Sequence, residues 1–301
     1  LNFTQFLSTY FGLTIGKYTT ITLTSGDMNE FAHGKGDTQF MNMALNLNPN
    51  IALTVPYSTL GAGIIALPTK DPHHAIVNFL VLSSTGKAST SGFEDLSDDN
   101  LTFAGEGRMR TDFFGMTGHQ LFGFSYSNRK FTSIDQNARF IFENGALEGK
   151  KGSWNIHYNF DQYIYEPKKG SGEGIGMFGR FGASDGNPNF MHFFYSLGIG
   201  GKGVIPNRER DRYGFGFYYI DVNNPELQGL FRGAKLLRDE YGFEVFYNIA
   251  ITPWLMLTPD VQVVRGAQKE QITIRRGVLE IPFIADRKSI GTATVFGLRL
   301  Q

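Results

Sequence analysis

The chain has 301 residues, no cysteine, and 28 basic against 28 acidic side chains, so its net charge is zero. This composition excludes disulfides and thiol chemistry, and it offers no net positive charge for binding nucleic acid. No run of about 20 apolar residues could form a membrane-spanning helix, although aromatic residues make up 14% of the chain and glycine is frequent, at 37 residues. The sequence instead contains segments of about ten residues in which apolar and polar side chains alternate, as they do in β-strands.

Thirteen segments of this kind are predicted to be strands. They lie near residues 1–8, 10–18, 57–67, 74–84, 101–113, 121–132, 153–166, 174–183, 190–202, 213–222, 242–251, 254–264 and 291–301. Dyad-repeat strands of this length with aromatic residues at their ends are typical of a transmembrane antiparallel β-barrel, an all-β fold. Residues 226–240 are also compatible with a short helix, and residues 19–56 form a long connection whose path the sequence leaves open.

The lengths of the predicted connections alternate between short and long. Outer-membrane barrels have short periplasmic turns and long external loops, so the first and the last predicted strands both run toward the periplasm. An even-numbered barrel has both termini in the periplasm, which requires an odd number of strands before Leu1. Three more strands would make sixteen. Residues 1–301 are therefore expected to be a single β-barrel domain that lacks its N-terminal strands.

The alternation also assigns a face to each side chain. One parity is apolar and is predicted to face lipid; it includes Val77, Met109, Phe160, Phe181, Phe193 and Phe217. The other parity is polar, and a charge on the lipid face would cost about 2–4 kcal/mol for Arg or Lys at the membrane midplane. The polar parity is therefore expected to face water inside the barrel.

Charged side chains of both signs fall on this inner parity. The predicted pore-lining and sugar-binding residues are Glu106, Arg108, Arg110, Asp161, Arg180, His192, Glu244 and Asp260. Arginine donates and carboxylates accept hydrogen bonds, and sugar hydroxyls do both, so a mixed lining can replace the water of a sugar. Phe178, Phe194 and Tyr218 share this face and could stack on a sugar ring. The alternative is that these charges only pair across the lumen and hold its shape.

Three further motifs are given structural interpretations. Two matches to G-x-G-x-x-G, which begin at Gly174 and Gly198, lie within strand patterns and do not open a helix, so a dinucleotide site is not predicted. His73 and His74 are adjacent and point to opposite faces of a strand, so they cannot share a metal ion. Arg208, Arg210 and Arg212, interleaved with acids, are predicted to form a solvated turn or an ion-paired latch, with a ring of guanidinium groups at the inner mouth as the alternative.

The run from Phe178 to Asn189, FGRFGASDGNPN, and the run from Tyr195 to Gly203, YSLGIGGKG, resemble the carbohydrate-selective porins of bacterial outer membranes. Further resemblance lies in GKGDTQFMN at 34–42, VPYSTLG at 55–61, IPNRERDRYGFG at 205–216, EVFYNIAITPW at 244–254, LTPDVQ at 257–262 and GLRL at 297–300.

This resemblance implies a sixteen-stranded barrel for passive, carbohydrate-preferring diffusion across the outer membrane, and not an enzyme. The implied partners are small neutral sugars and outer-membrane lipid, with no nucleic acid and no cofactor or metal; whether the protein forms a homo-oligomer stays open. A general diffusion porin is the alternative within the same class. A barrel-embedded enzyme and a structural surface barrel are alternatives from other classes.

Overall fold

The computed structural model describes residues 2–19, 29–33, 39–94, 99–228, 237–276 and 282–301. Thirteen strands pair antiparallel, each with its neighbours along the chain, in one sheet of the order β1-β2-β3-β4-β5-β6-β8-β9-β10-β11-β13-β14-β17. The strands are β1 Asn2–Phe6, β2 Phe11–Thr19, β3 Ser58–Ala66, β4 Ala75–Ser83, β5 Leu101–Thr111, β6 Gly118–Thr132, β8 Gly149–Tyr165, β9 Gly174–Ser184, β10 Met191–Lys202, β11 Arg212–Val222, β13 Glu240–Thr252, β14 Leu255–Arg265 and β17 Ala293–Leu300. Each of the thirteen predicted strands overlaps one of these, so the predicted strand pattern is confirmed.

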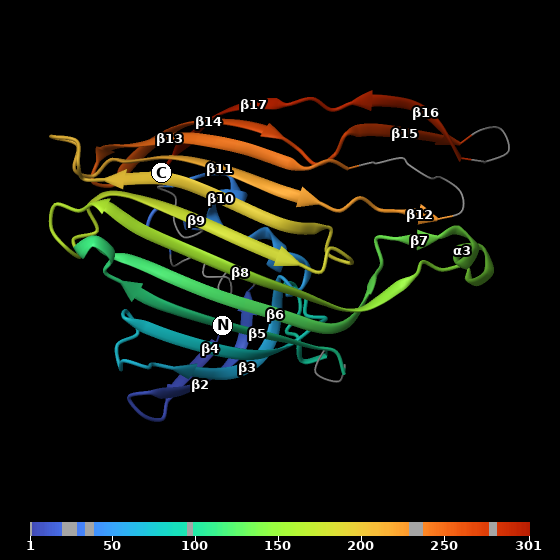
Figure 1. Ribbon diagram of the computed structural model, residues 1–301, viewed down its shortest axis with the longest axis horizontal. Helices are drawn as coiled ribbons and strands as arrows, with labels where there is room; N and C mark the ends of the chain where they lie inside the picture. The colour runs from blue at the N-terminus through green and yellow to red at the C-terminus, as the bar shows by residue number, and fades with distance from the viewer. Residues whose placement is uncertain (1, 20–28, 34–38, 95–98, 229–236, 277–281) are drawn as a thin grey trace.

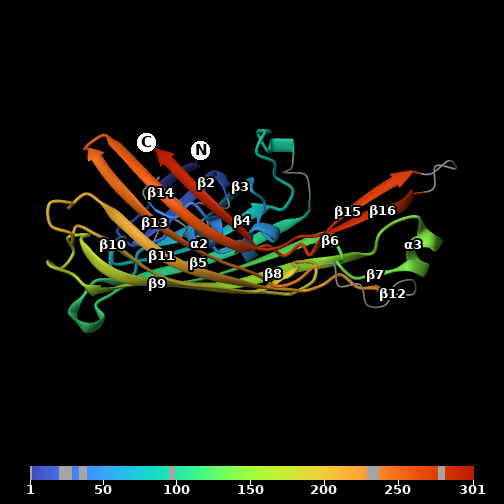
Figure 2. The ribbon, with the colours of Figure 1, turned by 90° about the horizontal axis from the view of Figure 1, so that it is seen from above.

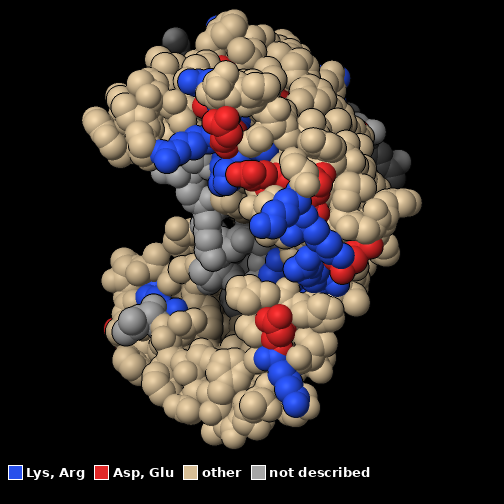
Figure 3. Space-filling model, turned by 90° about the vertical axis from the view of Figure 1, so that its left-hand side faces the viewer, with Lys and Arg blue, Asp and Glu red and all other residues tan. Residues whose placement is uncertain are grey.

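The sheet curls around its own inner face (Figures 1 and 2). Seen end-on, the molecule has a C-shaped outline, and β1 and β17 are the two edge strands of the sheet (Figure 3). Among the described residues no ladder joins β1 to β17. The sixteen strands expected for a closed barrel stay a prediction.

The remaining elements lie in the connections. They are the helices α2 Met43–Asn46, η1 Pro49–Leu53, η3 Phe113–Gly115 and α3 Ala138–Asn144, the parallel pair β7 Gln136–Asn137 and β12 Leu227–Gln228, and the hairpin β15 Glu270–Arg276 and β16 Pro282–Ser289. The long connection between the strands predicted near 254–264 and 291–301 contains this hairpin, which the sequence analysis did not predict. The short helix considered for 226–240 is contradicted at β12, and residues 229–236 lie outside the described part of the chain. None of the described helices is long and apolar enough to span a membrane.

The two ends of the sheet carry different connections. The connections at one end are mostly short, and we call it the short-turn end; they are residues 7–10, 67–74, 112–117, 166–173, 203–211 and 253–254. The connections at the long-loop end are residues 20–57, 84–100, 133–148, 185–190, 223–239 and 266–292. The predicted alternation is therefore confirmed with one exception: the connection 185–190 between β9 and β10 is short although it lies at the long-loop end.

The strand register separates two faces with different chemistry. On the outer face, Val77, Met109 and Phe217 are 45%, 53% and 43% exposed, whereas Phe160, Phe181 and Phe193 are partly covered by neighbouring side chains. On the inner face the polar side chains are buried, among them Asn155, His157, Arg180, Glu244 and Asp260. A slip of one residue would exchange the two faces, so this alternation confirms the predicted register.

The outer face is expected to tolerate apolar side chains and to reject charge. Phe217 lies in the middle of β11, opposite Leu197 of β10. Replacing Phe217 by Arg should lower the free energy of unfolding in lipid vesicles by about 2–4 kcal/mol, the cost of a cation near the midplane. Phe217→Leu, the control, should cost less than about 1.5 kcal/mol. Denaturant titration of both variants would measure this, and equal losses would contradict the assignment of this face to lipid.

Candidate functional site

The connection between β2 and β3 enters the curved sheet. Its described parts, residues 29–33 and 39–56, lie against the inner face (Figure 2), and we call them the inner segment. Near the short-turn end the Phe31 ring packs on the Tyr163 ring, with centroids 4.8 Å apart. Toward the long-loop end the Asn48 side-chain amide donates a hydrogen bond of 2.9 Å to the Phe181 carbonyl oxygen. The structure therefore places along the inner wall a connection whose path the sequence left open.

Glycines of the wall let the inner segment approach the sheet closely. A Cβ added at Gly200 would lie 2.9 Å from the Phe31 Cβ, and one added at Gly216 would lie 2.9 Å from the Leu45 Cδ1. Gly176 of β9 also faces the Phe31 ring. Gly176 and Gly200 belong to the two G-x-G-x-x-G matches, which run through β9 and β10 as predicted. These glycines make room for the side chains of the inner segment.

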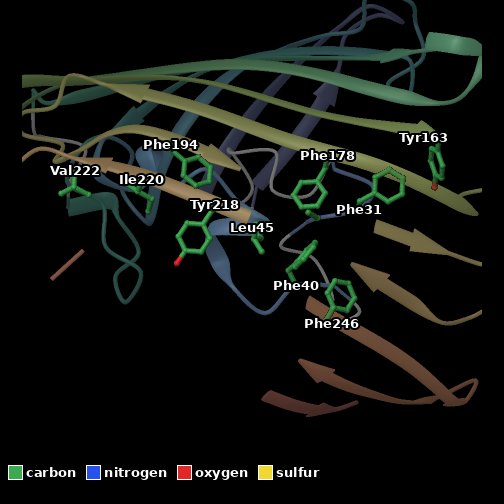
Figure 4. Close-up of a cluster of buried hydrophobic side chains, with 11 residues drawn as sticks. Phe31, Phe40, Leu45, Tyr163, Phe178, Phe194, Tyr218, Ile220, Val222 and Phe246 are labelled. Carbon is green, nitrogen blue, oxygen red and sulfur yellow. The ribbon is translucent and has the colours of Figure 1, made fainter. Parts of the chain in front are cut away.

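Aromatic side chains of the wall and of the inner segment form one buried cluster (Figure 4). The Phe40 ring meets the Phe178 ring at 5.4 Å and the Phe246 ring at 4.8 Å, both edge-on. Phe178, Phe194 and Tyr218 are 0–1% exposed. The prediction that these three could stack on a passing sugar is therefore wrong for this arrangement, because the inner segment covers them.

Two charged residues of the wall bind the two ends of α2. The Glu244 carboxylate accepts hydrogen bonds from the Met41 and Asn42 backbone N–H groups, at 2.6 and 2.8 Å, just before the helix. The Arg180 guanidinium donates to the carbonyl oxygens of Leu45, at 2.6 Å, and Asn46, at 3.1 Å, at its end. Arg180 also donates to the Ala32 carbonyl oxygen. The ends of a helix leave such N–H and carbonyl groups unpaired. Glu244 and Arg180 supply hydrogen-bond partners for these backbone groups, and the backbone groups supply partners for the two buried side chains.

Further polar contacts fix the rest of the inner segment. The Asn29 amide donates to Asn159 Oδ1 at 2.9 Å, and the Glu30 backbone N–H donates to Asp161 Oδ2 at 3.1 Å. Arg299 of β17 donates to the Gln39 carbonyl oxygen at 3.0 Å. Strands from β8 around to β17 thus bind the inner segment, mainly through the backbone groups and asparagine side chains of that segment.

Comparisons with known proteins agree with this architecture. The family model described as "Carbohydrate-selective porin, OprB family" matches residues 3–301. The chain belongs to the carbohydrate-selective porin, OprB family. Curated proteins yield no match to the sequence.

Two solved structures share the fold of this porin chain. The first, titled "High pH structure of Pseudomonas putida OprB", aligns with a TM-score of 0.67 at 18% identity, over 87% of this chain and 66% of that one. The second, titled "Low pH structure of Pseudomonas putida OprB", aligns with a TM-score of 0.51 at 16% identity, over 88% of this chain and 61% of that one. This chain thus spans less than two thirds of the length of either, and at this identity the likeness supports the β-barrel fold alone.

The structure separates the predicted pore residues of this porin chain into two groups. Arg180, Asp161, Glu244 and Asp260 are 0–4% exposed; the first three bind the inner segment, and Asp260 contacts the Glu244 carboxyl group and accepts a hydrogen bond of 2.9 Å from Gln262. No ion pair found among the described residues joins Arg180 to Glu244 or Asp260, so the pairing considered from the sequence is not formed.

The second group lies outside the contacts of α2. Arg108 is half-buried, and Glu106 lines a small cavity of about 10 Å³ beside His157. Arg110 lies 3.5 Å from Asp112 and donates to Thr117 Oγ1 at 3.2 Å. His192 Nδ1 lies 3.5 Å from Asp221 Oδ2, near the long-loop end. A part for these residues in sugar passage stays a prediction.

Sequence reasoning missed Glu30, which lies beside this inner wall. Its carboxyl group accepts a hydrogen bond of 3.3 Å from the Tyr163 hydroxyl. With Gln39, Lys202 and Arg212 it lines a cavity of about 20 Å³ near the short-turn end. Burial and the nearby Asp161 carboxylate raise the pKa of Glu30. Only the position of the inner segment brings Glu30 here, so strand periodicity gave no signal for it.

Asp211 ties the turn between β10 and β11 to the end of β13 at the short-turn end. It accepts hydrogen bonds from Arg208 Nε at 2.7 Å, the Tyr247 hydroxyl at 2.8 Å and the Ala250 backbone N–H at 2.9 Å. Burial raises the pKa of Asp211, but these hydrogen bonds outweigh burial and hold it below its usual value. Arg208 therefore forms an ion pair within its own turn, and the contacts to the neighbouring β13 are hydrogen bonds of Asp211. Charged side chains of both signs gather at this end on the closed side of the C (Figure 3).

The contacts of α2 predict how the inner segment responds to loss of a wall charge. A hydrogen bond to a charged group contributes about 1.5–3 kcal/mol. Glu244→Gln weakens two such bonds, so amide hydrogen exchange at Met41 and Asn42 should accelerate about tenfold or more. Mass spectrometry of peptides that span residues 39–46 would measure this. Asp221→Asn is the matched control and should change nothing there. Unchanged exchange in Glu244→Gln would show that the carboxylate does not hold this segment.

Proposed function

We propose that this chain forms the channel of a bacterial outer-membrane porin through which small sugars diffuse passively. The observation that carries the proposal is the inner segment, bound along a polar inner wall inside a curved sheet whose outer face is apolar. Such a segment narrows the space inside the sheet, and the remaining polar wall can exchange hydrogen bonds with a solute in place of water. The family of the chain supports sugars as the solutes.

The charges of the inner wall support sugars over ions. Arg108 lies near Asp161, Glu30 and Glu106, and Arg110 lies near Asp112, so positive and negative groups are mixed. A ring of one sign would select ions of the opposite sign. A mixed lining offers both donors and acceptors, which suits hydroxyl groups, and weak binding at several positions lets a solute leave again.

The general diffusion porin is the second candidate, because mixed charges could merely shape the passage. An enzymatic activity is not proposed, since membership in this family points to a channel. The family of the chain supports the outer membrane as its location, and the apolar outer face supports a lipid surrounding.

Liposome swelling distinguishes the two candidates. Arg108→Ala and Arg110→Ala should change the order in which neutral sugars of equal size enter, because each removes donors that some hydroxyl arrangements use more than others. Arg210→Ala, on an exposed turn, is the matched control and should preserve the order. If all neutral solutes change rate by the same factor in the Arg108 and Arg110 variants, the general porin is the better description.

A further inference from the structure

A row of three ionisable side chains crosses strands β5, β6 and β8 near the short-turn end, where these strands lie side by side (Figure 1). Arg110 lies directly opposite His119, and His119 lies directly opposite Asp161. Residues that face each other across antiparallel strands point to the same face of the sheet, and Asp161 binds Glu30 of the inner segment. All three side chains of the row therefore lie on the inner face.

The row passes from the covered part of the inner wall toward the open part. The Asp161 side chain is 1% exposed, the His119 side chain is 14% exposed and the Arg110 side chain is 34% exposed. The inner segment covers Asp161, which accepts a hydrogen bond from the Glu30 backbone N–H. His119 and Arg110 therefore lie at the margin of this segment, where a solute in the passage can meet both side chains.

Asp161 fixes the orientation of the His119 ring. Its Oδ1 lies 2.8 Å from His119 Nδ1, and its Oδ2 accepts the hydrogen bond of 3.1 Å from the Glu30 backbone N–H. A carboxylate only accepts hydrogen bonds, so the ring proton lies on Nδ1, and Nε2 of the neutral imidazole is an acceptor. The buried carboxylate thus holds the ring so that Nε2 is the atom left to accept a hydrogen bond.

Arg110 supplies hydrogen-bond donors beside this acceptor. Its Nε lies 3.5 Å from Asp112 Oδ1, and one of its terminal nitrogens donates to Thr117 Oγ1 at 3.2 Å. A guanidinium carries five N–H donors in a fixed plane, so these two contacts orient the group and leave donors for a further partner. Side chains directly opposite each other have Cβ atoms about 4.5–5.5 Å apart. Arg110 and His119 can therefore reach neighbouring atoms of one small solute.

We propose that Arg110 and His119 form a binding site for two adjacent hydroxyl groups of a sugar at the short-turn end of the channel. One hydroxyl accepts a hydrogen bond from Arg110, and its neighbour donates one to His119 Nε2. Asp161 is a positioning residue, because it acts through His119. A solute that lacks one of these hydroxyl groups leaves the donor or the acceptor unpaired. The inference rests on the proposed passage of sugars and adds a requirement for two neighbouring hydroxyl groups.

Liposome swelling with glucose and its monodeoxy analogues tests this site, because these solutes are all neutral and nearly equal in size. With the unsubstituted protein, at least one analogue should enter about two- to tenfold more slowly than glucose, because one hydrogen bond fewer holds it in the passage. His119→Phe keeps a ring but removes Nε2, so glucose should slow to the rate of that analogue. His119→Gln, whose amide oxygen accepts hydrogen bonds, should retain part of the difference. His73→Phe, on an exposed turn at the same end, is the matched control and should retain all of it.

Asp161→Asn separates positioning of the ring from its presence. The amide keeps an oxygen for the Glu30 N–H, and its NH2 group donates to Nδ1 of His119, which moves the ring proton to Nε2. The acceptor becomes a donor, so the difference between glucose and the analogue should fall although His119 is still present. Nitrogen NMR shifts of the ring should report Nδ1–H in the unsubstituted protein and Nε2–H in this variant. A purely structural role of Asp161 would not move this proton.

Equal entry of glucose and all of its analogues through the unsubstituted protein would overturn the inference, and so would a difference that persists in His119→Phe. In both cases sugars still enter, so the proposed channel would stand. Absence of swelling with every sugar would instead contradict the proposed function itself. Ion conductance in planar bilayers would show that each variant forms an open channel, so that lost discrimination is distinguished from misfolding.

Discussion

The position of the inner segment depends on the need to provide hydrogen-bond partners for two ionisable side chains that are buried on the inner wall. Arg180 and Glu244 lie on the inner wall, where neither is more than 4% exposed, and an unpaired charge in such a place is costly. Among the residues that the structure describes, neither side chain forms an ion pair, although Asp161 lies near Arg180 and the Asp260 carboxyl group contacts Glu244. Each meets the unpaired backbone groups at one end of α2 instead. A short helix of the inner segment thus replaces water for two charges, and the two charges supply the hydrogen bonds that the ends of the helix lack.

Glycine and aromatic residues make this contact possible at close range. The inner segment lies on a wall where Gly176, Gly200 and Gly216 leave space for Phe31 and Leu45. Phe178 and Phe246 then close on Phe40 and bury it. Polar binding at the ends of α2 and apolar packing beside it therefore act together, and the width of the passage follows from where this segment is held.

The strands could be predicted because a strand pattern depends only on the alternation of neighbouring residues. The face of each side chain followed for the same reason: Gly216 and Tyr218 lie on the inner face, so Phe217 between them must lie on the outer face. The path of residues 29–33 and 39–56 could not be predicted, since it depends on partners more than a hundred positions away, such as Glu244 for Met41. Arg180 was correctly placed on the inner face, but its partners are backbone carbonyl oxygens, which a pattern of side chains cannot predict.

Other differences have local causes. Phe178, Phe194 and Tyr218 share the inner parity with polar residues, and only the covering segment decides whether they meet solutes. The hairpin of β15 and β16 was missed because residues 265–290 were interpreted by their position in the alternation of connections, although 272–274 and 282–284 carry short β-branched and apolar runs. Glu30 had no periodic signal at all.

A reversible cross-link between the inner segment and the wall tests the central claim most directly. The chain has no cysteine, so a Phe31→Cys and Gly200→Cys pair would be its only thiols. The added Cβ at position 200 would lie 2.9 Å from that of residue 31, so the segment must shift by a few tenths of an ångström to reach the roughly 3.5–4.5 Å that a disulfide needs. The account predicts that the disulfide forms readily in the folded protein and that sugar swelling is the same when it is oxidised or reduced. A Phe31→Cys and Phe217→Cys pair, on opposite faces, should not form one. Failure of the first pair to cross-link, or sugar passage only after reduction, would show that the segment leaves the wall when the channel conducts.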